Sequence, residues 1–139
     1  MSDKGHLSII AFSGTVDRLY PVAVLASGAV AMDMRVDIFL TFWGLLAMRR
    51  EAPGFETLVS QDYGPEGERF LKLGAEVGLP TWKALLAQAK ELGDVHVKAC
   101  GMTMDLFGIK LEDLDAMVED VAGAGEFVDQ AKDGTTLVF

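Results

Sequence analysis

The sequence predicts an α/β fold in which a mainly parallel sheet of about five strands lies between two layers of helices, a three-layer sandwich of the flavodoxin-like or Rossmann-like type. Two observations predict it. Short segments that are continuously apolar, or that alternate between apolar and polar residues, recur along the chain, and segments of helical period separate them. Such alternation implies crossover connections, which place successive strands side by side in one parallel sheet.

The chain is long enough for one domain with a substantial core, so we expect a single domain over residues 1–139. Hydrophobic residues make up 50% of the sequence, and the mean hydropathy is +0.28. This composition indicates either strands that are buried on both faces or a large contact between subunits. We therefore expect a homo-oligomer.

Each predicted strand has its own signal. The apolar run LSIIAF is bounded by Gly5 and by Ser13, and the next strand alternates at first and then becomes wholly apolar up to Thr41. A third run, VHVKAC, alternates with period two and ends on Cys100. The predicted strands span residues 7–12, 34–41, 95–100, 117–121 and 135–139.

The predicted helices begin and end at recognisable residues. Ser13 or Thr15 can cap the first helix and Thr81 a later one, whereas Gly78 and Gly93 end two of them. Residues 51–67 contain several glycines and prolines and no clear period. The predicted helices span residues 15–32, 44–50, 68–78, 82–93, 102–107, 110–115 and 124–132.

Charge and hydropathy exclude several classes of partner. The net charge is −9, with no basic cluster to displace counterions from phosphates, so we expect no nucleic-acid partner. The apolar stretch over residues 19–32 is shorter than the ~20 residues of a membrane-spanning helix, so we expect no membrane partner. A signal peptide is not recognisable, which makes the cytoplasm the expected location, and His6 is expected on a flexible terminus.

A functional site is expected at the carboxyl ends of the strands, where open α/β sheets bind their ligands. Three segments follow the predicted strand ends. They are Ser13-Gly14-Thr15, Thr41-Phe42-Trp43-Gly44 and Cys100-Gly101-Met102.

Cys100 is the only cysteine, so it has no partner for an internal disulfide. It lies between a strand and a predicted helix, where the backbone N–H groups of Gly101 and Met102 favour a thiolate. Lys98 is the better candidate for charge support, because it lies two residues, or about 6.6 Å, from Cys100 along the strand, whereas His96 lies four residues away. The alternative is a cysteine that is merely packed as a small apolar residue.

The sequence indicates no cofactor and no metal. Two histidines and one cysteine lack the spacing of metal ligands. Neither a Walker motif nor the G-x-G-x-x-G motif is present, although Ser13-Gly14-Thr15 follows a strand as a phosphate-binding turn does.

Three segments occur in the order of an apolar first strand, then TFWGL, then ACGMTMDLFGI. In these segments and their order, the sequence resembles the DsrE/DsrF-like family, especially its DsrE2 or "peroxiredoxin-like" branch. This resemblance covers nearly the whole chain. It implies a flavodoxin-like domain that forms trimers or hexamers and carries sulfane sulfur on Cys100 as a persulfide. A rhodanese or a TusA-like protein is then the implied sulfur donor or acceptor.

Two functions follow as hypotheses. The first is a sulfur-carrier or sulfurtransferase-like protein with Cys100 as the acceptor and with Thr15, Thr41 and Trp43 lining its pocket. The second is a non-catalytic oligomeric module that binds a small ligand near Phe42 and Trp43, with a structural cysteine. Carriers and enzymes share such a site, so the sequence leaves catalytic turnover open.

Overall fold

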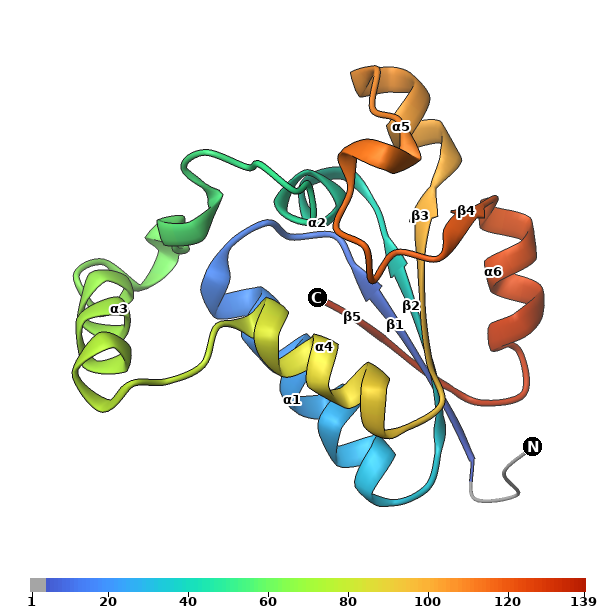
Figure 1. Cartoon of the computed structure of the whole chain (residues 1–139), viewed down its shortest axis with the longest axis horizontal. Helices are drawn as coiled ribbons and strands as arrows, with labels where there is room; N and C mark the ends of the chain where they lie inside the picture. Colours follow the sequence, from blue (N-terminus) through green and yellow to red (C-terminus); the bar gives the residue numbers. More distant parts are fainter. Residues whose placement is uncertain (1–4) are drawn as a thin grey trace.

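The computed structural model describes residues 5–139 and contains a five-stranded, all-parallel sheet (Figure 1). Its strand order is β4-β3-β2-β1-β5, which confirms the predicted α/β class. The connections are crossovers, since strands of a parallel sheet cannot be joined by tight hairpins. The strands are β1 (His6–Ala11), β2 (Arg35–Leu40), β3 (Val95–Cys100), β4 (Asp120–Ala122) and β5 (Thr135–Val138).

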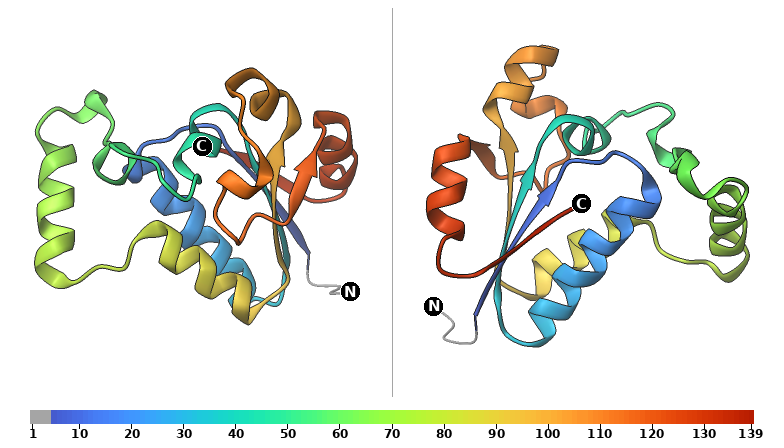
Figure 2. Two further views of the ribbon diagram at one scale, coloured as in Figure 1. Left: turned by 45° about the horizontal axis from the view of Figure 1, so that its top comes forward. Right: turned by 180° about the vertical axis from the view of Figure 1, so that it is seen from behind.

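Helices cover both faces of the sheet (Figures 1 and 2). Helices α1 (Val16–Ala31) and α4 (Trp82–Leu92) lie side by side on one face, and α6 (Ala124–Ala131) lies on the other. Helices α2 (Phe42–Ala47) and α5 (Gly101–Phe107) lie at the carboxyl edge, while α3 (Glu66–Val77) stands apart from the sheet. Three short 3₁₀ helices complete the chain: η1 (Phe55–Thr57), η2 (Gln61–Tyr63) and η3 (Leu111–Asp113).

The core is centred on the face of the sheet that α1 and α4 cover. Ile9, Ile38 and Val97 are in register on three adjacent strands, and all three are almost fully buried. Burial of a side chain of this size contributes about 1.5–3 kcal/mol. These strands and α1 therefore form a rigid frame for the residues that follow the strand ends.

The opposite face carries a buried carboxylate. Asp37 is 2% exposed and accepts hydrogen bonds from His6 and from Arg35, at 2.5 and 2.9 Å. Burial raises the pKa of Asp37, but the bonds from Arg35 and His6 outweigh it and hold that pKa below its usual value. The prediction that His6 lies on a flexible terminus is wrong, because His6 begins β1.

The other differences from the predicted elements are local. The fourth strand begins at Asp120 rather than at residue 117, because Asp115 holds a turn in which its carboxylate and carbonyl accept bonds from Met117 and Val118. Helix α2 begins at Phe42, two residues earlier than expected. Between residues 5 and 139, none of the helices combines the length and apolar character that crossing a membrane requires.

Candidate functional site

Cys100 is the last residue of β3 and the N-cap residue of α5. It is 5% exposed in the single chain. The next residue, Gly101, lies against β4, and a Cβ atom there would approach Val121 Cγ1 to 3.2 Å. A residue with a side chain at this position would require the Val121 side chain to shift by a few tenths of an ångström.

Hydrogen-bond donors from α5 and from Thr41, the residue between β2 and α2, lie around the thiol. Burial raises the pKa of Cys100, but hydrogen bonds from the hydroxyl and N–H of Thr103, the hydroxyl of Thr41 and the N–H of Met102 together lower the pKa below its usual value. The thiolate is therefore favoured by directed donors rather than by a neighbouring cation. The Met102 amide, one of the two backbone donors expected from the sequence, is among these bonds.

Thr103 is the residue that sequence reasoning missed. Its side chain is fully buried, its hydroxyl lies 3.2 Å from that of Thr41, and it accepts a hydrogen bond from the N–H of Phe42 at 3.2 Å. One hydroxyl thus joins α5 to the start of α2. Its position in the sequence could have indicated this role. Thr103 is three residues after Cys100, and the third residue of a helix lies close to the N-cap residue.

Phe42 has an unusual backbone conformation at this junction. Its φ angle is +46°, in the left-handed region that bulky residues rarely adopt. Its ring centroid lies 5.5 Å from that of Phe12 and 6.2 Å from that of Trp43. Together with the bond to Thr103, these contacts hold the first residue of α2 in a strained conformation next to the thiol.

Two glycines allow the segments after β1 and β2 to approach each other closely. A Cβ atom on Gly44 would lie 2.1 Å from the carbonyl oxygen of Ala11, and one on Gly14 would lie 2.7 Å from that of Trp43. Gly44 also donates a hydrogen bond to the Phe12 carbonyl at 3.0 Å. The structure therefore brings the segments after β1 and β2 together, and Thr41 connects them to Cys100.

Ser13 and Thr15 lie in this cluster, but their hydroxyls bond to each other at 3.2 Å. Ser13 Oγ also accepts the N–H of Thr15 at 3.3 Å. Thr15 is the N-cap residue of α1, yet its side chain makes no capping bond. The two hydroxyls therefore stabilise the turn after β1.

Lys98 and His96 have other partners. The Lys98 ammonium bonds to Glu126 of α6 at 3.2 Å, and His96 bonds to Asp94 at 2.6 Å and to Glu119 at 3.1 Å. Lys98 was expected to stabilise the Cys100 thiolate with its charge, but its ammonium pairs with Glu126 of α6. Within residues 5–139, no group of three or more histidine, cysteine or acidic side chains is arranged to hold a metal ion.

Exposed apolar side chains lie on the segments that follow β1, β2 and β3, at the same edge of the sheet as Cys100. The ring centroids of Trp43 and Phe107 lie 6.0 Å apart, so these side chains connect α2 with α5. Exposed apolar groups of this kind, gathered at one edge, are typical of a contact surface. We define this apolar rim by Phe12, Trp43, Met102, Leu106 and Phe107, all of which are exposed.

Comparison with known proteins places this arrangement in a family. The sequence profile of the DsrE/DsrF/DrsH-like family matches residues 3–63 and 58–139. The chain is 31% identical to the uncharacterized protein YrkE of Bacillus subtilis, covering 95% of this chain and 94% of that protein. It is 30% identical to the sulfur carrier protein DsrE2 of Allochromatium vinosum, covering 99% of each chain.

Two solved structures share the fold. One is the protein of unknown function MTH1491 from Methanobacterium thermoautotrophicum, with a TM-score of 0.60, 16% identity and coverage of 97% of this chain and 99% of that one. The other is the ychN protein from Escherichia coli, with a TM-score of 0.53, 17% identity and coverage of 96% and 99%. On the profile match and the full-length relatives, the chain belongs to the DsrE/DsrF/DrsH-like family.

Proposed function

We propose that the protein is a sulfur carrier in which Cys100 accepts a sulfane sulfur as a persulfide and passes it to an acceptor thiol. The observation that carries the proposal is the set of hydrogen bonds that lowers the pKa of the Cys100 thiol at the carboxyl edge of the sheet. The similarity to a sulfur carrier protein over the full chain supports the same function.

The transfer requires one thiolate and balances without an external oxidant. The Cys100 thiolate attacks the terminal sulfur of a donor persulfide, so that a new S–S bond forms while the donor's S–S bond breaks and its thiolate leaves. In the second step, an acceptor thiolate attacks the same terminal sulfur and Cys100 leaves as a thiolate. The donors at Thr41, Met102 and Thr103 stabilise the anion that each step consumes or releases.

The proposal includes partner proteins. A rhodanese or a TusA-like protein would approach the exposed rim, whose apolar side chains suit a protein surface better than they suit water. Self-association into a trimer or hexamer in the cytoplasm belongs to the same proposal. The apolar composition of the chain supports self-association.

A second function is favoured by one observation, the low exposure of Cys100. On this account the cysteine is structural and the domain is an oligomeric binding module. A native thiol titration with iodoacetamide separates the two functions. A carrier alkylates at Cys100 in the folded oligomer, whereas a structural cysteine reacts only after denaturant is added.

The direct test is loading with sulfur. The purified chain is incubated with polysulfide and its intact mass is measured before and after treatment with cyanide, which removes sulfane sulfur. We expect a gain of one sulfur atom that cyanide reverses and that Cys100→Ser abolishes. No gain in mass on the native chain, or an equal gain on Cys100→Ser, would refute the carrier function.

A further inference from the structure

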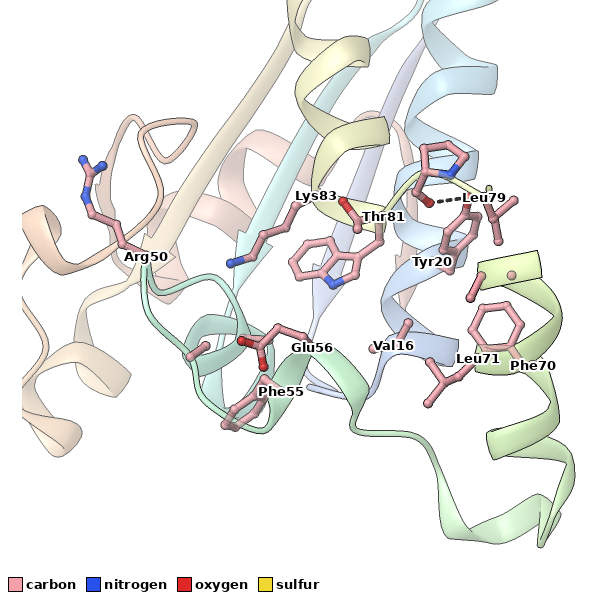
Figure 3. Close-up of a pocket in the computed structure, with 16 residues that line it drawn as sticks. Val16, Tyr20, Arg50, Phe55, Glu56, Phe70, Leu71, Leu79, Thr81 and Lys83 are labelled. Atoms are coloured by element: carbon pink, nitrogen blue, oxygen red, sulfur yellow. Dashed lines mark hydrogen bonds between the residues drawn. The ribbon is translucent and has the colours of Figure 1, made fainter. Parts of the chain in front are cut away.

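A pocket lies between α3 and the body of the domain, and its lining contains none of the residues around Cys100 (Figure 3). Phe70 and Leu71 project from α3 toward Val16 and Tyr20 of α1. The pocket volume is about 320 Å³. This value is near the lower end of the range for small-molecule sites, about 300–1,000 Å³.

The body of the pocket is apolar and largely pre-formed. Tyr20 and Phe70 meet edge to face with their ring centroids 6.1 Å apart, and the Tyr20 hydroxyl donates to the Pro80 carbonyl at 3.0 Å. Tyr20 thereby connects α1 both to α3 and to the loop after it. The Tyr20 hydroxyl already has a hydrogen-bond partner, so the short apolar body of a ligand could pack against this ring without burying an unpaired hydroxyl.

One end of the pocket is charged. Lys83 and Glu56 lie at this end, while the guanidinium of Arg50, which also lines the pocket, points away from it (Figure 3). Within residues 5–139, neither cation forms an ion pair with a carboxylate: Lys83 donates to the Arg49 carbonyl at 2.9 Å, and Arg50 donates to the Glu112 carbonyl at 3.0 Å. Asp115 and Glu56 favour the charged form of Lys83 from beyond ion-pair distance, and Arg49 disfavours it, so the ammonium has distant countercharges but no direct carboxylate partner among the described residues.

Lys83 is the cation at this end of the pocket, in a chain whose net charge is −9. Lys83 is also half-buried, and burial lowers its pKa because the ammonium is poorly hydrated there. An anion in the pocket would give Lys83 a direct ion-pair partner in addition to the more distant Asp115 and Glu56, whereas a cation would meet the Lys83 ammonium. The apolar volume and the charged end therefore select the same kind of ligand.

We propose that this pocket binds a small amphiphilic monoanion, whose apolar body fills the space between α3 and α1 and whose carboxylate or related anionic group pairs with Lys83. The site is independent of the sulfur chemistry at Cys100. Because α3 stands apart from the sheet, such a ligand would also fix α3 against α1.

The test is calorimetric titration of the full chain with octanoate, with octanol and acetate as matched probes. Octanol keeps the apolar body without the charge, and acetate keeps the charge without the body. We expect saturable binding of octanoate, weaker binding of octanol and no binding of acetate. Absence of saturable octanoate binding, or equal affinity for octanoate and octanol, would overturn the proposal.

Variants locate the site. Lys83→Met should weaken octanoate binding about tenfold, the worth of one charged hydrogen bond, and leave octanol binding unchanged. Lys72→Met is the matched control, because Lys72 is exposed on α3 and does not line this pocket. Octanoate affinity that is the same in Lys83→Met and in the unaltered chain would place the ligand elsewhere.

Two further variants keep the test decisive if Lys83→Met folds poorly. Ala75→Phe fills the pocket from α3 and should abolish binding of both octanoate and octanol. Glu56→Gln removes the only carboxylate among the residues that line the pocket and should tighten octanoate binding. Unchanged binding in Ala75→Phe, or weaker octanoate binding in Glu56→Gln, would contradict the assignment.

Discussion

The hydroxyl oxygens of Thr41 and Thr103 lie 3.2 Å apart and join the end of β2 to the first turn of α5 beside Cys100. Both hydroxyls also interact with the thiol and lower its pKa, so their two protons are shared among these three groups. The side chains that hold the two strand ends together are thus the same ones that favour the thiolate. Stability and reactivity are therefore coupled at this site.

Thr103→Val tests the hydrogen bond to the thiolate while it keeps the shape of the side chain. Because that bond lowers the pKa of Cys100, its loss raises the pKa and leaves less thiolate at neutral pH. We expect alkylation by iodoacetamide at pH 7 to slow about tenfold and to recover at high pH. Thr136→Val on β5 is the control, and identical pH profiles for the two variants would contradict the role of Thr103.

Phe42 tests the strained start of α2. Its φ of +46° suits glycine, and the strain costs an ordinary residue about 1 kcal/mol. We expect Phe42→Gly to be more stable than Phe42→Ala by about that amount in urea unfolding. Leu46, in the same helix, should show the reverse order because alanine favours a helix. The same order at both positions would show that Phe42 is not strained.

Gly44→Ala tests the close approach of α2 to β1. The new Cβ atom would overlap the Ala11 carbonyl, so α2 must move away from the strand end. We expect a loss of at least about 2 kcal/mol in the free energy of unfolding, together with a change in the rate of Cys100 alkylation. Gly28→Ala in α1 is the matched control. Its Cβ atom meets nothing within 4 Å, so it should stabilise the chain by about 0.5–1 kcal/mol.

Asp37 gives a pH dependence of stability. Its pKa in the folded chain is below the ordinary value of 3.8, so its stabilising contribution is present above that value and is lost as the pH falls through the folded pKa. We expect Asp37→Asn to cost about 3 kcal/mol at pH 7 and progressively less below pH ~4. Asp62→Asn, at an exposed pair with Arg18, should cost less than about 1 kcal/mol. A cost for Asp37→Asn that does not change with pH would contradict this assignment.

The parallel sheet could be predicted because its signal is local. The runs LSIIAF and VHVKAC show by their own pattern that they are buried strands, and the helices between them require crossovers. His6 could not be placed in this way. In the folded chain it pairs with Arg35 of β2 and bonds to Asp37, which is 31 residues away along the chain.

The candidate site could be predicted in part. The topology rule selects the ends of β1, β2 and β3, and Gly14, Gly44 and Thr41 do connect these segments. The roles of Thr103 and Lys98 depend on where their side chains point, which the sequence does not specify. The pocket beside α3 was missed because its walls come from segments that are distant in the sequence, including the region without clear periodicity.

The central claim is that Cys100 holds a transferable sulfur atom. The most direct measurement is mass spectrometry of the chain loaded with polysulfide, freed of excess reagent and then mixed with glutathione. We expect the chain to lose the mass of one sulfur atom while an equal amount of glutathione persulfide appears, and Cys100→Ser to yield none. Sulfur that stays on Cys100, or a mixed disulfide between Cys100 and glutathione with release of sulfide, would contradict the claim.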